Sequence, residues 1–180
     1  MGIVRWHTTL SVDGFVAGPE DAMDWVFAHP GPIPEVDEVI ARTGAILCGR
    51  RTYDVGRRPE QRPEATEPFG GAWHGPQFVL THRPPGQEPD PSITFLSGDI
   101  ADAVDTALGA AGGRDLLLLG ADVARQCVER DLVDELLVHV VPILLGDGVR
   151  LFTRRGAPVP LSPPTVTTTG PVTTLRFRLR

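Results

Sequence analysis

The chain of 180 residues contains no lysine and no asparagine, and all 17 of its basic residues are arginines. Without lysine it can form no Schiff base on a lysine, no phosphate loop of the Walker type and no serine–lysine hydrolase site. Serine is also scarce, with Ser11, Ser92, Ser97 and Ser162 only, and none of them lies in a Gly-x-Ser-x-Gly turn. A serine hydrolase is therefore not expected.

Cysteine is limited to Cys48 and Cys127, which lie far apart in apolar stretches, and the five histidines are scattered singly. A structural zinc site needs four ligands at short spacings. Two cysteines cannot form a disulfide scaffold, and a chain of this length does not require one. We expect both cysteines to be core thiols, and we expect no metal site.

An excess of positive charge is absent too, since the formal net charge is −6 at pH 7. Proteins that bind nucleic acid in general need a surplus of basic residues. Met1–Leu10 lacks the charged and then apolar pattern of a signal peptide. The longest apolar run, Leu136–Leu145, is interrupted by His139 and Pro142 and is too short to cross a bilayer. We expect a cytoplasmic protein that binds neither nucleic acid nor membrane.

The composition, with 41% hydrophobic and 22% charged residues, is typical of a globular protein. This length is that of one domain, residues 1–180, and glycine and proline are frequent enough to predict many loops. Apolar residues at strand and helix spacing alternate through the middle of the chain. The pattern predicts a three-layer α/β fold with a mostly parallel central sheet and a C-terminal antiparallel hairpin.

The spacing of apolar residues and of turn residues places the elements along the chain. Leu116–Leu119 is apolar on both faces and is therefore expected to be a central parallel strand. Asp99 is expected to cap the helix that follows it. Strands are expected at 3–10, 45–48, 78–81, 93–96, 116–119 and 135–141, helices at 35–43, 100–111 and 121–130, a surface excursion at 57–76, and a hairpin at 166–180.

Three of these strands end in residues that suit an anion. Gly49-Arg50-Arg51-Thr52 follows the second strand, Thr81-His82-Arg83 ends the third, and Gly120 with Asp122 leads from Leu116–Leu119 into a helix. Carboxyl ends of parallel strands meet at one edge of a sheet, where guanidinium groups and helix N-termini bind phosphates. The alternatives are two solvated arginines and a tight turn that needs Gly120 and an Asp122 cap.

The loop after the first strand contains a further candidate, Asp13-Gly14. It is either a plain turn or a carboxylate that hydrogen-bonds the N–H groups of a substrate. An exposed Asp13 predicts that Asp13→Asn leaves stability nearly unchanged. Trp25 is expected in the core or in a pocket wall, and His139 is expected to be a core histidine with its hydrogen bonds satisfied.

Taken in order, the motifs resemble the dihydrofolate reductase-like superfamily, and more closely its branch that contains the reductase domain of riboflavin biosynthesis. The resemblance covers nearly the whole chain. It is carried by Ser11–Gly18 (SVDGFVAG), Ile46–Tyr53 (ILCGRRTY), Leu118–Gly120, Leu132–Leu136 (LVDEL), Pro142–Gly148 (PILLGDG) and Leu151–Phe152.

The resemblance implies NADPH as cofactor and assigns roles to residues. Asp13 matches the carboxylate that riboflavin-type reductases direct at a pyrimidine, and Phe15, Trp25 and Asp147 are expected in the substrate pocket. Dihydrofolate reductases carry an acidic residue on the first helix, for which Asp24, Glu35 and Asp37 are the candidates. The expected cofactor contacts are Gly49, Arg50, Arg51, Thr52, Thr81, His82, Arg83, Leu119, Gly120, Ala121, Asp122, Val123 and Ala124.

These matches lead us to expect an NADPH-dependent reductase that transfers hydride to a pteridine- or pyrimidine-like small molecule, similar to 5-amino-6-(5-phosphoribosylamino)uracil reductase or dihydrofolate reductase. We also expect a twofold homodimer, because related domains pair through the last third of the chain. An NADP(H)-binding sensor or carrier without turnover is the alternative, and a homodimeric scaffold with an unused cleft is a third possibility.

Overall fold

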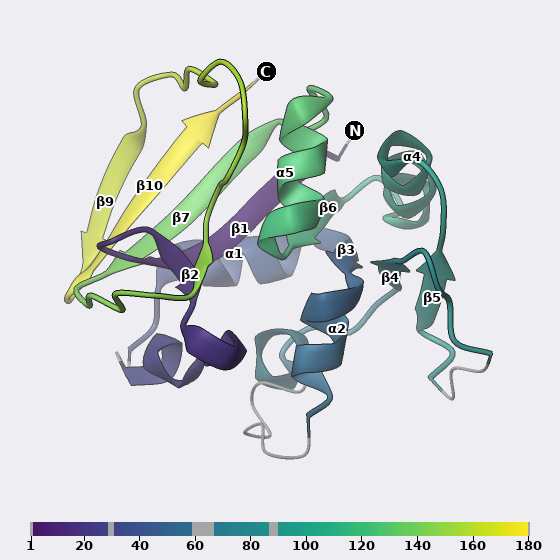
Figure 1. Ribbon diagram of the computed structural model, residues 1–180, viewed down its shortest axis with the longest axis horizontal. Coiled ribbons are helices and arrows are strands. Elements are labelled where there is room, and N and C mark those ends of the chain that lie inside the picture. Colours follow the sequence, from purple (N-terminus) through teal and green to yellow (C-terminus); the bar gives the residue numbers. More distant parts are fainter. Residues whose placement is uncertain (1, 29–30, 59–66, 87–89, 180) are drawn as a thin grey trace.

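A computed structural model describes residues 2–28, 31–58, 67–86 and 90–179. Its central feature is an eight-stranded sheet with strand order β5-β4-β3-β6-β1-β7-β10-β9, beside a small sheet of β2 and β8 (Figure 1). The strands are β1 (Val4–Ser11), β2 (Phe15–Ala17), β3 (Thr43–Gly49), β4 (Gln77–Leu80), β5 (Ile93–Leu96), β6 (Asp115–Leu119), β7 (Glu135–Val141), β8 (Val149–Arg150), β9 (Thr165–Thr169) and β10 (Val172–Arg178).

The sheet is parallel from β5 to β7, and β10 and β9 continue it as an antiparallel pair. β1 lies at its centre, where Trp6 is the register partner of Leu118 on β6 and of Leu136 on β7. The expected fold, a mostly parallel sheet with a C-terminal antiparallel hairpin, is therefore confirmed.

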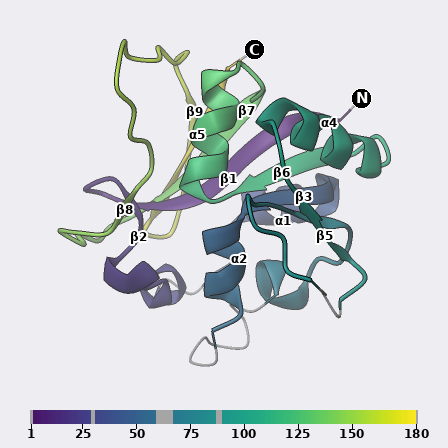
Figure 2. The ribbon, with the colours of Figure 1, turned by 45° about the vertical axis from the view of Figure 1, so that its right-hand side comes forward.

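Helices cover both faces of the sheet, which gives the three expected layers (Figure 2). The hydrophobic side chains of α4 and α5 pack on one face, and Val39 of α1 packs on the other. Asp99 caps α4 as expected, since its Oδ1 accepts the N–H of Ala101 at 2.8 Å. The helices are α1 (Pro34–Arg42), α2 (Arg50–Gly56), α4 (Ile100–Ala110) and α5 (Ala121–Glu129), with short 3₁₀ turns η1 (Pro19–Asp21), η2 (Asp24–Ala28) and η3 (Pro68–Gly71).

β6 shows why a run of leucines becomes a central strand. Leu116 and Leu118 point to the face under α4 and α5, while Leu117 points to the face under α1. All three are at most 1% exposed, because successive side chains of a strand alternate between two covered faces. Cys48 and Cys127 are free and buried, and burial raises the pKa of each thiol to about 12, which makes them the expected inert core thiols.

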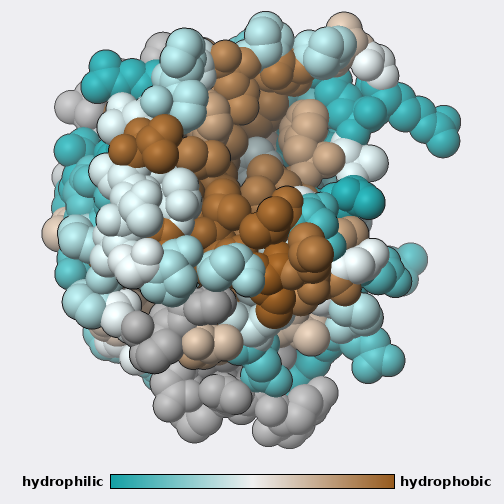
Figure 3. Space-filling model, turned by 90° about the vertical axis from the view of Figure 1, so that its left-hand side faces the viewer, coloured by the Kyte–Doolittle hydropathy of each residue, from teal (hydrophilic) through white to brown (hydrophobic). Residues whose placement is uncertain are grey.

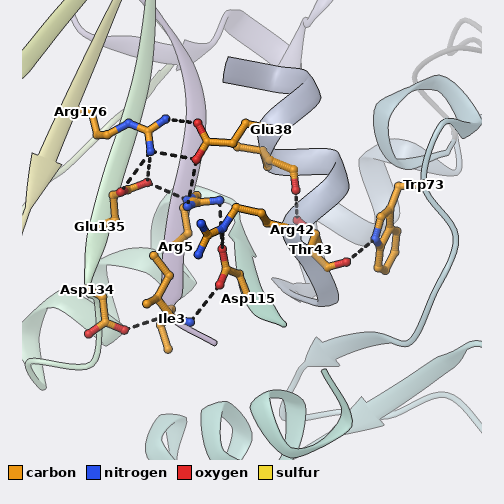
Figure 4. A network of polar contacts seen from close by, with 12 residues as sticks. Ile3, Arg5, Glu38, Arg42, Thr43, Trp73, Asp115, Asp134, Glu135 and Arg176 are labelled. Carbon is orange, nitrogen blue, oxygen red and sulfur yellow. Dashed lines mark hydrogen bonds and ion pairs between the residues drawn. The ribbon is translucent and has the colours of Figure 1, made fainter. Parts of the chain in front are cut away.

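The amino-terminal edge of the sheet is held by a cluster of charges (Figure 4). The guanidinium of Arg5, which is 2% exposed, contacts Glu135 at 2.7 Å, Asp115 at 3.2 Å and Glu38 at 3.7 Å. Arg42 and Arg176 complete the cluster by pairing with Asp115 and Glu38. Three arginines thus balance three carboxylates, so the cluster carries no net charge. It joins β1, β6, β7, β10 and α1.

The expected surface excursion at 57–76 is only partly correct, and 59–66 lies outside the described residues. Trp73 is 4% exposed, and its Nε1 donates to the carbonyl oxygen of Thr43 at 2.9 Å. Burial of the large apolar indole stabilises the fold, so this part of the segment packs against the core although the residues around it are polar. Among the helices in the described ranges, none has the length and apolar character needed to cross a membrane.

Candidate functional site

A cavity of about 1230 Å³ lies at the carboxyl edge of the sheet. Its walls include the last residues of four parallel strands, which are Gly49, Leu80, Leu119 and Val141. Pockets for small ligands typically enclose roughly 300–1,000 Å³. This cavity is larger than that range, so it can hold a dinucleotide together with a second small molecule.

One end of the cavity is a cradle between the starts of α2 and α5. Gly120, at φ +92°, leads into α5, and a Cβ added to it would lie 2.3 Å from Oγ1 of Thr52 on α2. Only glycine allows this approach and this backbone angle. Among the described residues no side chain caps α2 or α5, and the first N–H groups of a helix have no partner within the helix. The cradle therefore offers backbone donors to an anion.

The cavity brings together most residues expected to bind a cofactor. Two of them lie elsewhere: Ala124 is fully buried in the core, and Arg83 is exposed beyond the lining. The expected residues that do line the cavity are Gly49, Arg50, Arg51, Thr52, Thr81, His82, Leu119, Gly120, Ala121, Asp122 and Val123.

Arg50 is held in place within this wall. Its Nε donates to Oδ1 of Asp54 at 2.8 Å, and its Nη1 donates to the carbonyl oxygen of Arg83 at 3.3 Å. The guanidinium carbon lies about 6 Å from the ring centres of Tyr53 and Phe95. A solvated arginine would not be fixed on so many sides. Arg50 is therefore a preorganised cation at the cavity wall.

Arg51 and Asp122 both pair with other side chains. Nη2 of Arg51 lies 2.7 Å from Oδ1 of Asp21, whose other oxygen is 2.9 Å from Nη2 of Arg58. Arg51 thus shares the one buried carboxylate with Arg58, so the group keeps a net positive charge, and the Arg51 side chain is still 72% exposed at the cavity wall. Asp122 accepts hydrogen bonds from Arg125 and Gln126 on its own helix, both at 2.8 Å. Its negative charge is thus partly balanced at the cradle.

The other end of the cavity has an apolar wall. Asp24, Glu35 and Asp37, the candidates for an acidic residue near the first helix, do not line the cavity. In their place α1 presents Val36 and Ile40, and η2 adds Val26, Phe27 and its neighbour Met23 to the wall. A planar, largely apolar ring fits this end better than a cation does.

Two histidines on neighbouring strands form a polar part of this end. Nε2 of His7 on β1 lies 2.8 Å from Nε2 of His139 on β7, and Nδ1 of His139 lies 2.8 Å from Oγ1 of Thr174 on β10. The ring of His7 also stacks on Phe69 with centroids 5.8 Å apart. Both histidines line the cavity, although His139 is only 1% exposed.

Burial keeps both imidazoles neutral. It lowers the pKa of His7 to about 3, helped by repulsion between the two imidazoles when both are protonated and by the positive charge of Arg5. It also lowers the pKa of His139 to about 4, where Arg176 adds to the effect and Glu35 opposes it. The interpretation of His139 as a core histidine with satisfied hydrogen bonds is correct but incomplete. No pattern in the sequence marks His7, because its partner is identified only once β1 and β7 are known to pair.

Asp13 is held by hydrogen bonds from the protein itself. Its oxygens accept from Oγ of Ser11 at 2.7 Å, from the N–H of Gly146 at 2.7 Å and from the N–H of Leu145 at 3.1 Å. Asp13 does not line the cavity. The carboxylate ties the loop after β1 to the loop after β7. Its role as a catalytic residue stays a prediction.

The three residues expected in the substrate pocket also lie outside the cavity lining. Phe15 is buried beneath the guanidinium of Arg150, 4.6 Å from the ring centre. Trp25 packs against Val141 and Val172 in a small core cluster. Asp147 is exposed and accepts the N–H of Gly148 at 2.7 Å. Packing and local turn geometry therefore account for these three side chains.

Asp13→Asn is expected to destabilise the protein, contrary to the expectation from sequence. The hydrogen bond from Ser11, followed by those from Gly146 and Leu145, lowers the pKa of Asp13 to about 2. Because the folded pKa lies below the unfolded value near 3.8, this stabilisation is present above pH 3.8 and is lost as the pH falls toward 2. Asparagine keeps one acceptor oxygen and cannot satisfy all three donors.

Thermal unfolding at pH 7 and pH 3 measures this effect. Asp13→Asn should lower the midpoint by several degrees at pH 7 and by less at pH 3. Asp105→Asn, at an exposed position of α4, is the matched control and should leave the midpoint unchanged. Equal midpoints for wild type and Asp13→Asn at pH 7 would show that the two loops do not depend on this carboxylate.

The described residues contain no group of three or more His, Cys, Asp or Glu side chains that could hold a metal ion.

The comparisons with known proteins agree with the fold. Residues 3–175 match the family described as RibD C-terminal domain. The chain is 23% identical to protein YwjB of Bacillus subtilis over 148 residues, which is 81% of this chain and 80% of that protein.

Solved structures with low sequence identity share the fold. A riboflavin biosynthesis protein from Shewanella sp. PV-4 superimposes with a TM-score of 0.74 at 22% identity, over 98% of each chain. The riboflavin biosynthesis reductase Rib7 of Saccharomyces cerevisiae gives a TM-score of 0.65 at 17% identity, over 99% of this chain and 90% of that one.

Proposed function

Because the chain belongs to the RibD C-terminal domain family, we propose that it is an NADPH-dependent reductase acting on a pteridine- or pyrimidine-like small molecule. The observation that carries the proposal is the large cavity at the carboxyl ends of β4, β3 and β6. There, Gly120 packs so closely on Thr52 that two helix N-termini form one anion cradle. The cavity continues from that cradle into an apolar compartment, so a cofactor and a second molecule can lie next to each other. Hydride transfer between two bound molecules requires this proximity.

The residues present fit a dinucleotide phosphate. Backbone N–H groups at the starts of α2 and α5 would hold the pyrophosphate, and Thr52 adds a hydroxyl at the same place. Arg50, with Thr81 and His82 on the neighbouring strand end, would hold the adenosine side with its extra phosphate. NADPH, when bound, supplies the hydride.

The chain itself supplies position and exclusion of water. Val26, Val36 and Ile40 form a wall against which a planar ring can pack, and His7 with His139 offers the ring neutral hydrogen-bonding groups. A ring held in this way lies in a low-dielectric compartment, where correct orientation contributes much of the rate enhancement. The substrate we propose is therefore flat, neutral at its reacting ring and rich in ring nitrogens.

Titration with NADPH and NADH, followed by a screen of oxidised pteridines and pyrimidines, tests the proposal. The expected result is tighter binding of NADPH and loss of the reduced-cofactor absorbance with at least one ring compound. Absence of binding by both cofactors would refute the proposed function.

Arg50→Ala is expected to weaken NADPH binding about thirtyfold, or roughly 2 kcal/mol, with little change for NADH. The two cofactors differ by one phosphate on the adenosine ribose, and a guanidinium can hold it with two parallel charge-assisted bonds. Calorimetric titration of both cofactors measures the ratio. Arg130→Ala is the control, because Arg130 pairs with Asp99 away from the cavity lining. Equal weakening of both cofactors would place Arg50 on the pyrophosphate instead.

One observation favours a second candidate function, an NADP(H)-binding sensor or carrier without turnover. The cavity wall formed by α1 contains Val36 and Ile40 and no carboxylate that could bind a pterin ring. Tight NADPH binding with no oxidation across the whole substrate panel would favour this candidate over the reductase.

The surface also supports the proposal of a twofold homodimer. Hydrophobic side chains gather on the face of the molecule that lies at the left of Figure 1 (Figure 3). The exposed large apolar residues include Val12, Leu144 and Val166. Val12 lies next to Leu144, because the N–H of Val12 donates to the carbonyl oxygen of Ile143. Apolar patches of this kind commonly mark interfaces.

A further inference from the structure

A second cavity of about 340 Å³ lies between α1 and the C-terminal hairpin. Most of the residues that line it are polar or charged, in contrast to the apolar wall of the main cavity. It is lined by Pro34, Glu35, Glu38, Thr165, Thr167, Thr174 and Arg176. Nothing in the proposed function so far uses this cavity.

The two cavities are joined by hydrogen bonds. Thr174 lines the second cavity, and its Oγ1 lies 2.8 Å from Nδ1 of His139. His139 lines the main cavity, and its Nε2 lies 2.8 Å from Nε2 of His7, which lines the main cavity as well. The path therefore runs through two protein–protein hydrogen bonds from one cavity to the other.

Each group on this path can donate one proton while it accepts another. A neutral imidazole has one N–H donor and one acceptor nitrogen, and a hydroxyl has both functions on its oxygen. Both imidazoles stay neutral near pH 7, since their pKa values lie near 3 and 4. A proton can therefore cross the path by exchange of tautomers, without a charge being stored on either ring.

We propose that His7, His139 and Thr174 form a proton relay that connects the second cavity to the main cavity. Resting on the proposed function, we further assign it the delivery of the proton that accompanies hydride during reduction of a C=N or C=O group. The relay ends at His139 and His7 in the wall of the main cavity, so it gives this proton a route through the protein to the reacting ring.

Hydride from a bound reduced nicotinamide cofactor would reduce the carbon of the substrate's double bond, and the nitrogen or oxygen at its other end would take a proton from His7. His7 accepts the Nε2 proton of His139 as its own proton leaves. His139 accepts the hydroxyl proton of Thr174 at Nδ1, and the Thr174 oxygen takes a proton from water in the second cavity. That water regains a proton from the solvent. The relay ends neutral, with both tautomers inverted.

The second cavity is suited to the supply of protons. Glu35 accepts a hydrogen bond from Thr167 through Oε1, while its Oε2 is buried with no hydrogen-bond partner among the described residues. The hydrogen bond from Thr167 lowers the pKa of Glu35, so its negative charge is present at neutral pH and attracts protons. Arg5 faces His7, Arg176 and Glu35 act on His139, and Glu38 pairs with Arg176.

Ring ¹⁵N chemical shifts of the histidines test the relay without any substrate. In the wild type the tautomers of the two imidazoles should be coupled, because the proton between the two Nε2 atoms belongs to one ring only and the hydroxyl of Thr174 bonds to the other nitrogen of His139. Thr174→Val keeps the shape of the side chain but removes the hydroxyl. It should alter the ring shifts of His7 as well as those of His139, although His7 has no hydrogen bond with Thr174.

Two variants control this measurement. Thr174→Ser restores a hydroxyl and should restore the wild-type ring shifts of both histidines. Thr173→Val changes the neighbouring residue of β10, whose side chain points to the opposite face of the sheet, and should leave both unchanged. If Thr174→Val shifts His139 alone, the three groups are merely packed together and the relay is refuted.

Turnover of a substrate found in the screen tests the assigned use. Thr174→Val should lower kcat at least tenfold with KM and NADPH affinity unchanged, and Thr174→Ser should restore kcat. Wild-type kcat in Thr174→Val would overturn proton delivery by the relay. If no compound is reduced while the ring shifts of His7 still respond, the reductase assignment fails and the relay between the cavities stands.

Discussion

Replacement of Arg5 by methionine is expected to lower the free energy of unfolding by about 3–5 kcal/mol, the usual cost of removing one member of a buried ion cluster. Arg5 balances Glu135 and Asp115 at the centre of the amino-terminal edge, and its side chain is 2% exposed. Without it, the cluster keeps an uncompensated negative charge away from water. Urea unfolding followed by circular dichroism measures the change.

Two further variants separate the charge from the side-chain volume. Arg178→Met alters an exposed arginine of β10 and should change stability by no more than about 0.5 kcal/mol. Arg5→Met combined with Glu135→Gln removes one charge of each sign and should recover part of the loss. If the double variant is less stable than Arg5→Met by the full cost of Glu135→Gln alone, charge imbalance is not the cause.

Gly120→Ala is expected to raise the Kd for NADPH at least tenfold, or about 1.4 kcal/mol. The new Cβ would lie 2.3 Å from Oγ1 of Thr52, and the φ angle of +92° is strained for any residue with a Cβ. Either α5 moves away from α2 or Thr52 leaves its rotamer, and both changes open the anion cradle. Calorimetric titration with NADPH measures the loss.

Gly109→Ala is the matched control for this variant. Gly109 lies within α4, where an added Cβ would meet nothing within 4 Å, and alanine should stabilise the helix by about 0.5–1 kcal/mol. Its NADPH affinity should equal that of the wild type. Wild-type affinity in Gly120→Ala would show that cofactor phosphates do not bind at the junction of α2 and α5.

The three layers of the fold and the residues of the anion cradle could be predicted from the sequence, because both depend on local patterns. Four leucines at 116–119 followed directly by Gly120 favour a buried strand that turns into a helix. Arg50 follows a buried strand in the same way. Residues at strand ends reach the edge of the sheet whatever the rest of the chain does, so their convergence could be predicted.

The rest of the site depends on contacts between distant parts of the chain. His7 and His139 are separated by 132 positions and meet only because β1 pairs with β7. Two of the three donors to Asp13, the N–H groups of Leu145 and Gly146, come from a loop just as far along the chain, so the sequence could not show that Asp13 ties two loops together. Trp73 turned inward for a similar reason, since its acceptor belongs to Thr43.

The charge cluster and the cavity lie at opposite ends of the same strands. β1 contributes Arg5 to the amino-terminal edge and Thr9 to the cavity, and β6 contributes Asp115 and Leu119 in the same way. Substitutions that reshape the cavity wall therefore leave the ion cluster intact. The ligand preference can change through the loops at the carboxyl edge while the ion cluster at the other edge keeps the sheet rigid. This separation makes the scaffold well suited to engineered changes of specificity.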